Sequence, residues 1–344
     1  MRLLETAKVE CTQKLREVTQ LTECQALMEC WVHLARRMKR IKALRCFLAK
    51  KLLISPLIHL SFSESGTFLL AITAVFSAFV FDIEDLKTSY EFSILPALRA
   101  DKMAKALVTN SGEHVVVATV NGRICSFASE DGAIVNEDTL HLSFVTSLRA
   151  NAEGTQVAVG YDDSLIRLLT LPGLTTLIDL KKQYIEIQDI CLFDGILGSV
   201  DKSGHTLYWD IARSVTVERL VLTGMRNYSM RGVQLIGLMD SSKHTVVRTI
   251  NCVSKQDREY GAIPLGASIA IQLGEDMRTL SCFILTTGQF QLYDLVTGEA
   301  QEIAGPENVV LAAINPGYPL VAVSKRDGGL ELWAIEWELE QAED

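Results

Sequence analysis

A short pattern of strands and turns recurs along most of the chain, and no other sequence feature constrains the fold as strongly. Each copy has an apolar strand, a turn with Gly, a second apolar strand, a polar turn, and a third strand that ends in an aromatic residue or Leu. The clearest copy spans residues 145–169, and the one after residue 230 is badly degraded. Copies begin near residues 58, 106, 145, 187, 230, 268 and 310. A regular interval of this size predicts an array of similar small sheets.

The last residues of the third strand identify the kind of array. Phe81-Asp82, Trp209-Asp210 and Tyr293-Asp294 stand where WD repeats place Trp-Asp, and Trp333 matches only as an aromatic residue. A four-stranded sheet cannot bury both faces alone, so such sheets stack radially. We therefore expect an all-β fold, a seven-bladed WD-type β-propeller. Residues 51–55 are the expected outer strand of its last blade.

The first 51 residues differ from the rest of the chain. They carry 12 basic and 5 acidic side chains, whereas the remainder carries 21 basic and 37 acidic ones. Apolar residues spaced three and four apart, such as Trp31, Leu34 and Met38, predict a helical extension. The expected organisation is a basic helical segment over 1–51, a propeller over 52–338 and an acidic tail over 339–344.

Half of the residues from 36 to 51 are basic and none is acidic, which predicts a basic amphipathic helix there. One interpretation is a solvated helix face that packs its apolar side on the propeller or on another copy of itself. The functional alternatives are attachment to an anionic membrane surface or docking on an acidic partner. The basic residues concerned are Arg36, Arg37, Lys39, Arg40, Lys42, Arg45, Lys50 and Lys51.

Composition and spacing argue against several function classes. The net charge of -9 disfavours a protein that binds nucleic acid mainly through phosphate contacts. The eight cysteines form no CxxC pair or zinc spacing and are expected to be reduced thiols in a cytoplasmic protein. The most apolar stretch, 67–81, is shorter than the roughly 20 residues that cross a bilayer. We expect no transmembrane segment.

No catalytic motif is recognisable in the sequence. A phosphate-binding GxxxxGK loop, a GxGxxG after a strand, HExxH and GxSxG are all missing. The six histidines are scattered, and Asp162-Asp163 lies in an expected turn, where hydrogen bonding within the turn is the simpler interpretation. We expect neither an enzyme nor a bound cofactor or metal. A propeller enzyme with acidic residues converging on the axis is the disfavoured alternative.

Residues 145–230 resemble one particular propeller family. The third copy is followed by Leu171-Pro172-Gly173-Leu174, the fourth opens with Glu186-Ile187-Gln188-Asp189, and Arg226-Asn227-Tyr228 precedes the degraded fifth copy. These features are similar to the cytosolic propeller of the endoplasmic-reticulum exchange factors for the Sar-type small GTPase, the prolactin regulatory element-binding protein family. Members of that family carry a long first-blade loop that binds a potassium ion and a membrane-spanning helix. Here the corresponding segment, 74–78, is short and apolar.

The resemblance implies a guanine nucleotide exchange factor that acts in COPII vesicle formation and ER-to-Golgi transport. Its partner would be a Sar-type GTPase, and its place would be the cytoplasm, peripheral on the endoplasmic reticulum. Exchange needs no covalent chemistry, because a factor that prefers the nucleotide-free GTPase shifts the equilibrium by that preference. The expected partner surface is Tyr161, Asp162, Glu186 and Asp189. The alternative is an interaction scaffold without exchange activity.

Overall fold

The computed structural model is built almost entirely of strands. It describes residues 38–51, 55–84, 87–98, 101–139, 141–222, 224–240, 244–252, 255, 257–264, 269–273, 279–284, 289–294, 300–301, 308–318 and 320–339. The one helix in these ranges is the single turn α3 (Leu95–Leu98). The expected all-β class is confirmed. The chain divides into two compact units, residues 44–335 and residues 1–43 together with 336–344.

Six sheets each consist of four consecutive antiparallel strands, and all six lie within the unit 44–335. Their strands are β2 (Leu57–Phe62), β3 (Phe68–Thr73), β4 (Ser77–Asp82), β5 (Lys87–Ser93); β6 (Met103–Val108), β7 (His114–Thr119), β8 (Ile124–Ala128), β9 (Ile134–Asp138); β10 (Val145–Ala150), β11 (Gln156–Tyr161), β12 (Ile166–Thr170), β13 (Thr176–Leu180); β14 (Ile187–Phe193), β15 (Ile196–Asp201), β16 (His205–Asp210), β17 (Val215–Val221); β18 (Met225–Arg231), β19 (Gln234–Asp240), β20 (His244–Asn251), β21 (Asp257–Pro264); β22 (Ile269–Leu273), β23 (Thr279–Ile284), β24 (Gln289–Asp294) and β25 (Ala300–Gln301).

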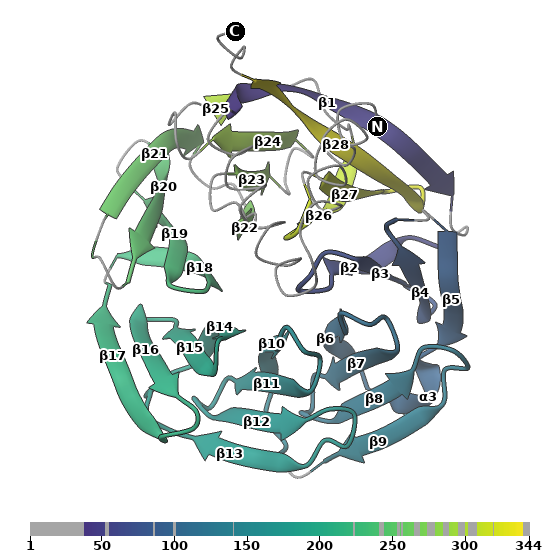
Figure 1. Ribbon diagram of the computed structural model, residues 1–344, viewed down its shortest axis with the longest axis vertical. Helices are drawn as coiled ribbons and strands as arrows, with labels where there is room; N and C mark the ends of the chain where they lie inside the picture. Colours follow the sequence, from purple (N-terminus) through teal and green to yellow (C-terminus); the bar gives the residue numbers. More distant parts are fainter. Residues whose placement is uncertain are drawn as a thin grey trace, which may run out of the picture. The chain divides into compact units, whose positions relative to one another are not determined.

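Within this unit the sheets are blades set around a common axis (Figure 1). The first strand of each blade is innermost, and each inner strand from β2 to β18 contacts the inner strand of the next blade. β4, β16 and β24 end at Asp82, Asp210 and Asp294, as the aromatic-Asp signals predicted. The propeller arrangement expected from the repeat is confirmed.

The remaining sheet has a different origin. Its order is β1-β28-β27-β26, so β26 (Val309–Ile314), β27 (Leu320–Lys325) and β28 (Gly329–Leu339) are joined by β1 (Met38–Lys51). Both β1 and β28 extend across the boundary between the two units. The expectation of seven like blades is therefore corrected: six blades are made of consecutive strands, and one further sheet is assembled from the two ends of the described chain.

The predicted basic helix over 36–51 is wrong, because residues 38–51 form the strand β1. Helix propensity is a weak preference, and pairing with the outer side of β28 overrides it. The idea that a preceding segment supplies an outer strand is correct, but the strand ends at Lys51 where the expected one began. Residues 1–37, the rest of the predicted helical extension, lie outside the described residues.

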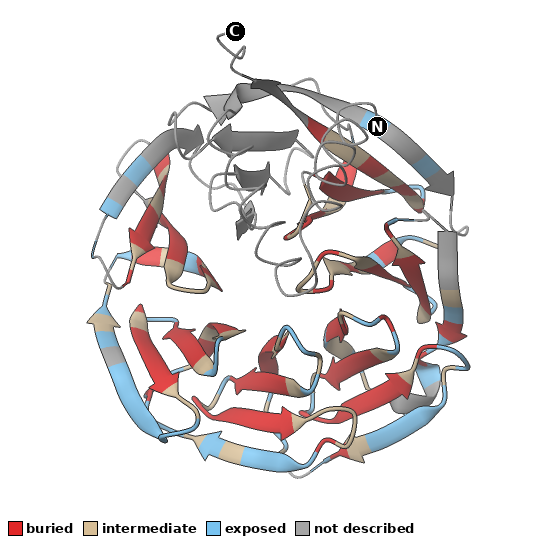
Figure 2. Ribbon diagram, in the orientation of Figure 1, coloured by how far each residue is buried: buried red, intermediate tan, exposed pale blue. Residues whose placement is uncertain are grey.

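Apolar cores lie between neighbouring blades. Val80 and Ile72 of one blade pack with Val115 and Phe127 of the next, and all four side chains are fully buried. Equivalent clusters join each following pair of blades as far as β18–β21. Figure 2 shows the result: the middle strands are buried, and the outer strands β9, β13 and β17 are largely exposed. Each sheet is thus stabilised by its two neighbours rather than by an interior of its own.

A register shift recurs at the start of several inner strands, and no sequence motif indicates it. In β2, β6, β10 and β14 the register shifts just after the first pair, which places His59, Lys105, Ser147 and Asp189 at equivalent positions. Such β-bulges bend a strand and redirect its side chains. Because the bulge recurs, these four residues form a comparable set beside the axis.

Candidate partner-binding face

The antiparallel order brings three kinds of segment to one side of the unit 44–335. These are the beginnings of the inner strands, the links that lead into them, and the turns between second and third strands. We call this side the start face. The turn after β11 is tied to the preceding link, because Asp162 N–H donates to Phe144 O at 3.0 Å. Lys202 N–H likewise donates to Glu186 O at 2.9 Å in the next blade.

Large apolar side chains are exposed along the start face. Tyr184 and Leu142, in two successive links, are 82% and 79% exposed. Exposed apolar groups that gather on one side of a soluble protein indicate an interaction surface. The set comprises Ile58, Val75, Leu95, Leu142, Phe144, Tyr184 and Ile185. Sequence analysis missed these residues because it looked for charged and polar chemistry. Their signal was present: large apolar residues in the links between repeats, where no core position is expected.

Two of the four predicted contact residues, Asp162 and Glu186, lie on the start face. Asp162 is exposed, and its Oδ1 accepts a hydrogen bond from Phe144 N–H at 3.1 Å. Glu186 is half-buried and pairs with Lys202 Nζ at 3.1 Å. Both carboxylates therefore fix the links that present the apolar side chains. Fixing a link before binding lowers the entropy cost of the contact.

The other two predicted residues do not lie on this surface. Tyr161 is 0% exposed and stacks edge-on against His141, with ring centroids 4.5 Å apart. Burial raises the pKa of its phenol. The Asp163 carboxylate beside it lies 3.3 Å from His141 Nε2. Tyr161 is therefore a core residue, and the expectation that it contacts a partner is not supported by its position.

Asp189 is a buried connector between three blades. Its Oδ1 accepts from Ser147 Oγ of β10 at 3.0 Å, and its Oδ2 accepts from Met230 N–H of β18 at 2.9 Å. Arg149 Nη2 lies 3.4 Å from each oxygen. The Asp189 charge raises the pKa of Arg149 above its already high value. The position of this carboxylate indicates a structural role.

Lys105 of β6 and His59 of β2 lie on the two inner strands that precede β10 around the axis. Burial and the charge of Arg149 lower the pKa of Lys105, and the charge of Asp189 acts in the opposite direction. Burial and the Lys105 charge lower the pKa of His59 to about 4, so its imidazole is neutral at pH 7. His59 Nε2 lies 2.9 Å from Ser61 Oγ. We call Lys105, Arg149, Asp189 and His59 the axial cluster. No sequence motif indicates it, because the four residues are at least 40 positions apart.

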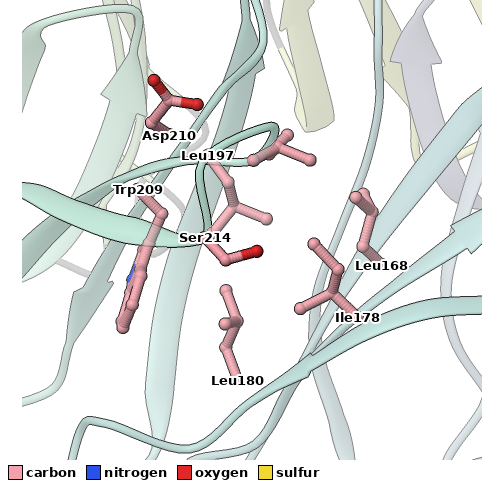
Figure 3. Close-up of a pocket in the computed structure, with 8 residues that line it drawn as sticks. Leu168, Ile178, Leu180, Leu197, Trp209, Asp210 and Ser214 are labelled. Carbon is pink, nitrogen blue, oxygen red and sulfur yellow. The ribbon is translucent and has the colours of Figure 1, made fainter.

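A small cleft lies between the third and fourth blades (Figure 3). Its volume of about 10 Å³ corresponds to a single water molecule. Leu168, Leu180, Leu197 and Trp209 make its walls mostly apolar. Asp210 is beside it, but Asp210 Oδ1 accepts from Arg213 N–H at 2.9 Å and stabilises the local turn. The cleft is a packing gap between two blades rather than a ligand site.

Other predicted features are described only in part. Arg40, Lys42, Arg45, Lys50, Lys51 and Lys39 fall in β1, of which the backbone is described, and Arg36 and Arg37 lie outside the described residues. Among the described residues, no group of three or more His, Cys, Asp or Glu side chains could hold a metal ion. None of the described helices has the length and apolar character to cross a membrane.

Comparison with known proteins adds no identification. The chain matches no family model. A search of curated proteins also gives no match. The assignment of function therefore depends on the fold, the start face and the resemblance described above.

Proposed function

We propose that this protein is a protein-binding propeller that engages its partner through the start face. The observation that carries the proposal is the gathering of exposed apolar side chains there, led by Tyr184 and Leu142. Aromatic and aliphatic side chains of this size contribute the largest energies at protein interfaces when a partner buries them. Two hydrogen bonds hold the link at Phe144: Asp162 N–H donates to Phe144 O, and Phe144 N–H donates to Asp162 Oδ1. The surface is thus apolar and locally ordered before contact.

In its specific form, the proposal names the partner as a Sar-type small GTPase and the activity as guanine nucleotide exchange in COPII vesicle formation. The support is the resemblance of residues 145–230, whose links contribute Tyr184, Ile185 and Glu186 to the start face. Such a factor would bind the nucleotide-free GTPase more tightly than the loaded one. It would act beside the endoplasmic reticulum membrane. Contact of the basic segment 36–51 with an anionic membrane or an acidic partner stays a prediction.

The same proposal includes closure of the propeller. β26 contacts the inner strands β2 and β22 on either side of it. We take the sheet β1-β28-β27-β26 as the seventh blade, with β1 as its outer strand. A blade that joins both ends of a propeller stabilises the ring as a whole, so deletion of residues 1–51 should lower the midpoint of urea unfolding. An unchanged midpoint would contradict this closure.

Release of a fluorescent GDP analogue from a Sar-type GTPase tests the specific form. The full chain should accelerate release, and the Leu142→Ser/Tyr184→Ser variant should lose most of that acceleration. Val215→Ser is the matched control, because Val215 is likewise an exposed apolar residue, at 50%, but lies in the outer strand β17. No acceleration by the folded full chain would reject exchange. Binding without acceleration would favour the alternative, a scaffold that uses the same face.

A further inference from the structure

The link between the third and fourth blades places a buried polar residue beside two exposed apolar ones. Gln183 is only 4% exposed, whereas Tyr184 and Ile185 are 82% and 40% exposed. In most proteins glutamine lies at the surface and isoleucine in the core. This link reverses both preferences within three consecutive residues. An aromatic ring with its hydroxyl group and an aliphatic side chain are therefore accessible to a partner, while the amide is not.

The Gln183 amide is bonded to the fourth blade through both of its polar atoms. Its Nε2 donates to His205 O, at the start of β16, at 2.6 Å. Its Oε1 accepts from Ser199 Oγ of β15 at 2.8 Å, and Ser199 is fully buried. Hydrogen bonds shielded from water in this way make the groups that they join rigid. Gln183 thus attaches the link to two strands of the blade that follows it.

The carbonyl group that Gln183 contacts belongs to an ordered turn. Asp201, at the end of β15, is fully buried, and its Oδ1 accepts from Ser203 N–H at 2.9 Å and from His205 N–H at 3.0 Å. These two bonds shape the turn between β15 and β16 and hold the backbone at His205. The attachment point of Gln183 is therefore fixed before any partner arrives.

A second attachment lies on the other side of the two exposed residues. Glu186 O accepts from Lys202 N–H at 2.9 Å, and the Glu186 carboxylate pairs with Lys202 Nζ at 3.1 Å. Tyr184 and Ile185 therefore lie between two attached residues, Gln183 and Glu186. We call these two residues the projection. A group that is ordered before contact loses less conformational entropy when it binds.

We propose that Gln183 is a positioning residue for partner binding, because it fixes the projection in the orientation that a partner encloses. The partner that fits is a protein with an apolar pocket for the Tyr184 ring and the Ile185 side chain, and with a hydrogen-bond acceptor for the phenol. This inference rests on the proposed function, since it specifies how the start face makes contact. It assigns part of the affinity to a buried amide that does not itself touch the partner.

The order of the projection in the full chain without partner is the first test, measured as backbone amide order parameters by NMR. Tyr184 and Ile185 should have values of about 0.85, as rigid backbone does, and Gln183→Met should lower them to about 0.6 or below. This variant keeps the side-chain size and removes both hydrogen bonds. Parent values already below about 0.6, or values that Gln183→Met does not change, would overturn the proposal.

Ser126→Ala is the matched control. Ser126 is also fully buried, and its Oγ donates to Pro172 O at 2.7 Å. Pro172 follows β12, on the side of the unit opposite the start face. Ser126→Ala therefore removes a buried hydrogen bond between two blades without touching the projection, and both order parameters should stay at the parent values. A decrease equal to that of Gln183→Met would overturn the assigned role.

A double-mutant cycle with nucleotide-free Sar-type GTPase measures what this order contributes to binding. Gln183→Met should weaken the affinity about fivefold, because the projection must then become ordered on contact. In a Tyr184→Ser/Ile185→Ser chain, the same change should weaken it less than about twofold. Equal losses in both backgrounds would overturn the proposal. If the parent chain does not bind, the GTPase form of the proposed function fails, and the order parameters still decide whether Gln183 fixes the projection.

Discussion

The third blade (β10–β13) and the fourth (β14–β17) have the same backbone plan and different side chains at its critical points. In both, the N–H of the turn after the second strand donates to the preceding link, from Asp162 to Phe144 and from Lys202 to Glu186. In the third blade, His141 lies against the turn residue Asp163. In the fourth, Gln183 donates from Nε2 to His205 O and accepts from Ser199 Oγ.

This difference indicates that backbone hydrogen bonds, rather than a fixed set of side chains, define a blade in this protein. A His-Asp contact occupies this position in the third blade, and a glutamine amide that bonds to His205 O and Ser199 Oγ occupies it in the fourth. Buried polar groups need partners, but several residue types can provide them. The WD signature is therefore lost from most copies while the blades persist.

In the comparison of the two blades, substitution of a turn glycine should have the largest effect on the free energy of unfolding. Gly204 has φ +86, and a Cβ there would lie 1.7 Å from Leu222 O of the backbone. Gly204→Ala should cost about 4 kcal/mol of unfolding free energy, because a left-handed residue is strained and the backbone contact cannot be relieved by a rotamer change. Urea unfolding followed by circular dichroism measures the loss.

Gly195 is the matched control for that variant. Its φ is +72, and a Cβ there would meet nothing within 4 Å. Gly195→Ala should therefore cost only the backbone strain, about 1 kcal/mol. Equal losses at the two glycines would show that the close approach of Leu222 O does not constrain the fourth blade.

Asp189 sharpens the comparison at the inner strand, since the equivalent residue of the third blade is Ser147. Asp189→Ala removes partners from Ser147, Met230 and Arg149 together. We expect a loss of about 3 kcal/mol, the low end for a broken buried pair, because Arg149 is partly exposed. The control Asp162→Ala loses one surface hydrogen bond and should cost about 1 kcal/mol or less. Similar losses would contradict the connector role.

His59 occupies the same register position in the first blade and makes stability depend on pH. Its folded pKa is about 4, below the ordinary 6.5, so the unfolded chain binds more protons between these values. The contribution of the neutral His59 imidazole to the free energy of unfolding is complete above pH 6.5 and is lost as the pH falls toward 4. We expect a decrease of roughly 2 to 3 kcal/mol over this range. His59→Gln should flatten this part of the stability profile, and an unchanged profile would contradict burial of a neutral imidazole.

The smallest expected effect concerns Ser164, the third-blade counterpart of Gly204. Its φ is +74, although it is not glycine. Ser164→Gly should raise the unfolding free energy by up to about 1 kcal/mol, because glycine adopts this conformation without strain. Chemical denaturation resolves a change of this size. A loss of stability would show that the Ser164 side chain contributes more than its backbone strain costs.

The sequence was sufficient to predict the propeller fold but not to predict which residues form its surfaces. Aromatic-Asp pairs such as Trp209-Asp210 and the repeat interval placed third strands correctly, because those residues serve local turns and blade cores. β1 was predicted as a helix, because its partner β28 is nearly 280 residues away and local periodicity carries no sign of it. Lys105 and Arg149 lie on adjacent inner strands, β6 and β10, which only the fold brings together. Leu142 and Tyr184 were visible as apolar residues in links, but their common face depends on the fold.

The affinity of the full chain for a nucleotide-free Sar-type GTPase, compared between two variants, tests the central claim most directly. Leu142→Ser/Tyr184→Ser changes the start face, and Val215→Ser/Val217→Ser changes the exposed outer strand β17. The account predicts that the first pair weakens binding at least tenfold while the second leaves it within about twofold, since a few central apolar residues dominate an interface. Equal affinities for both variants, or a larger loss from β17, would contradict it.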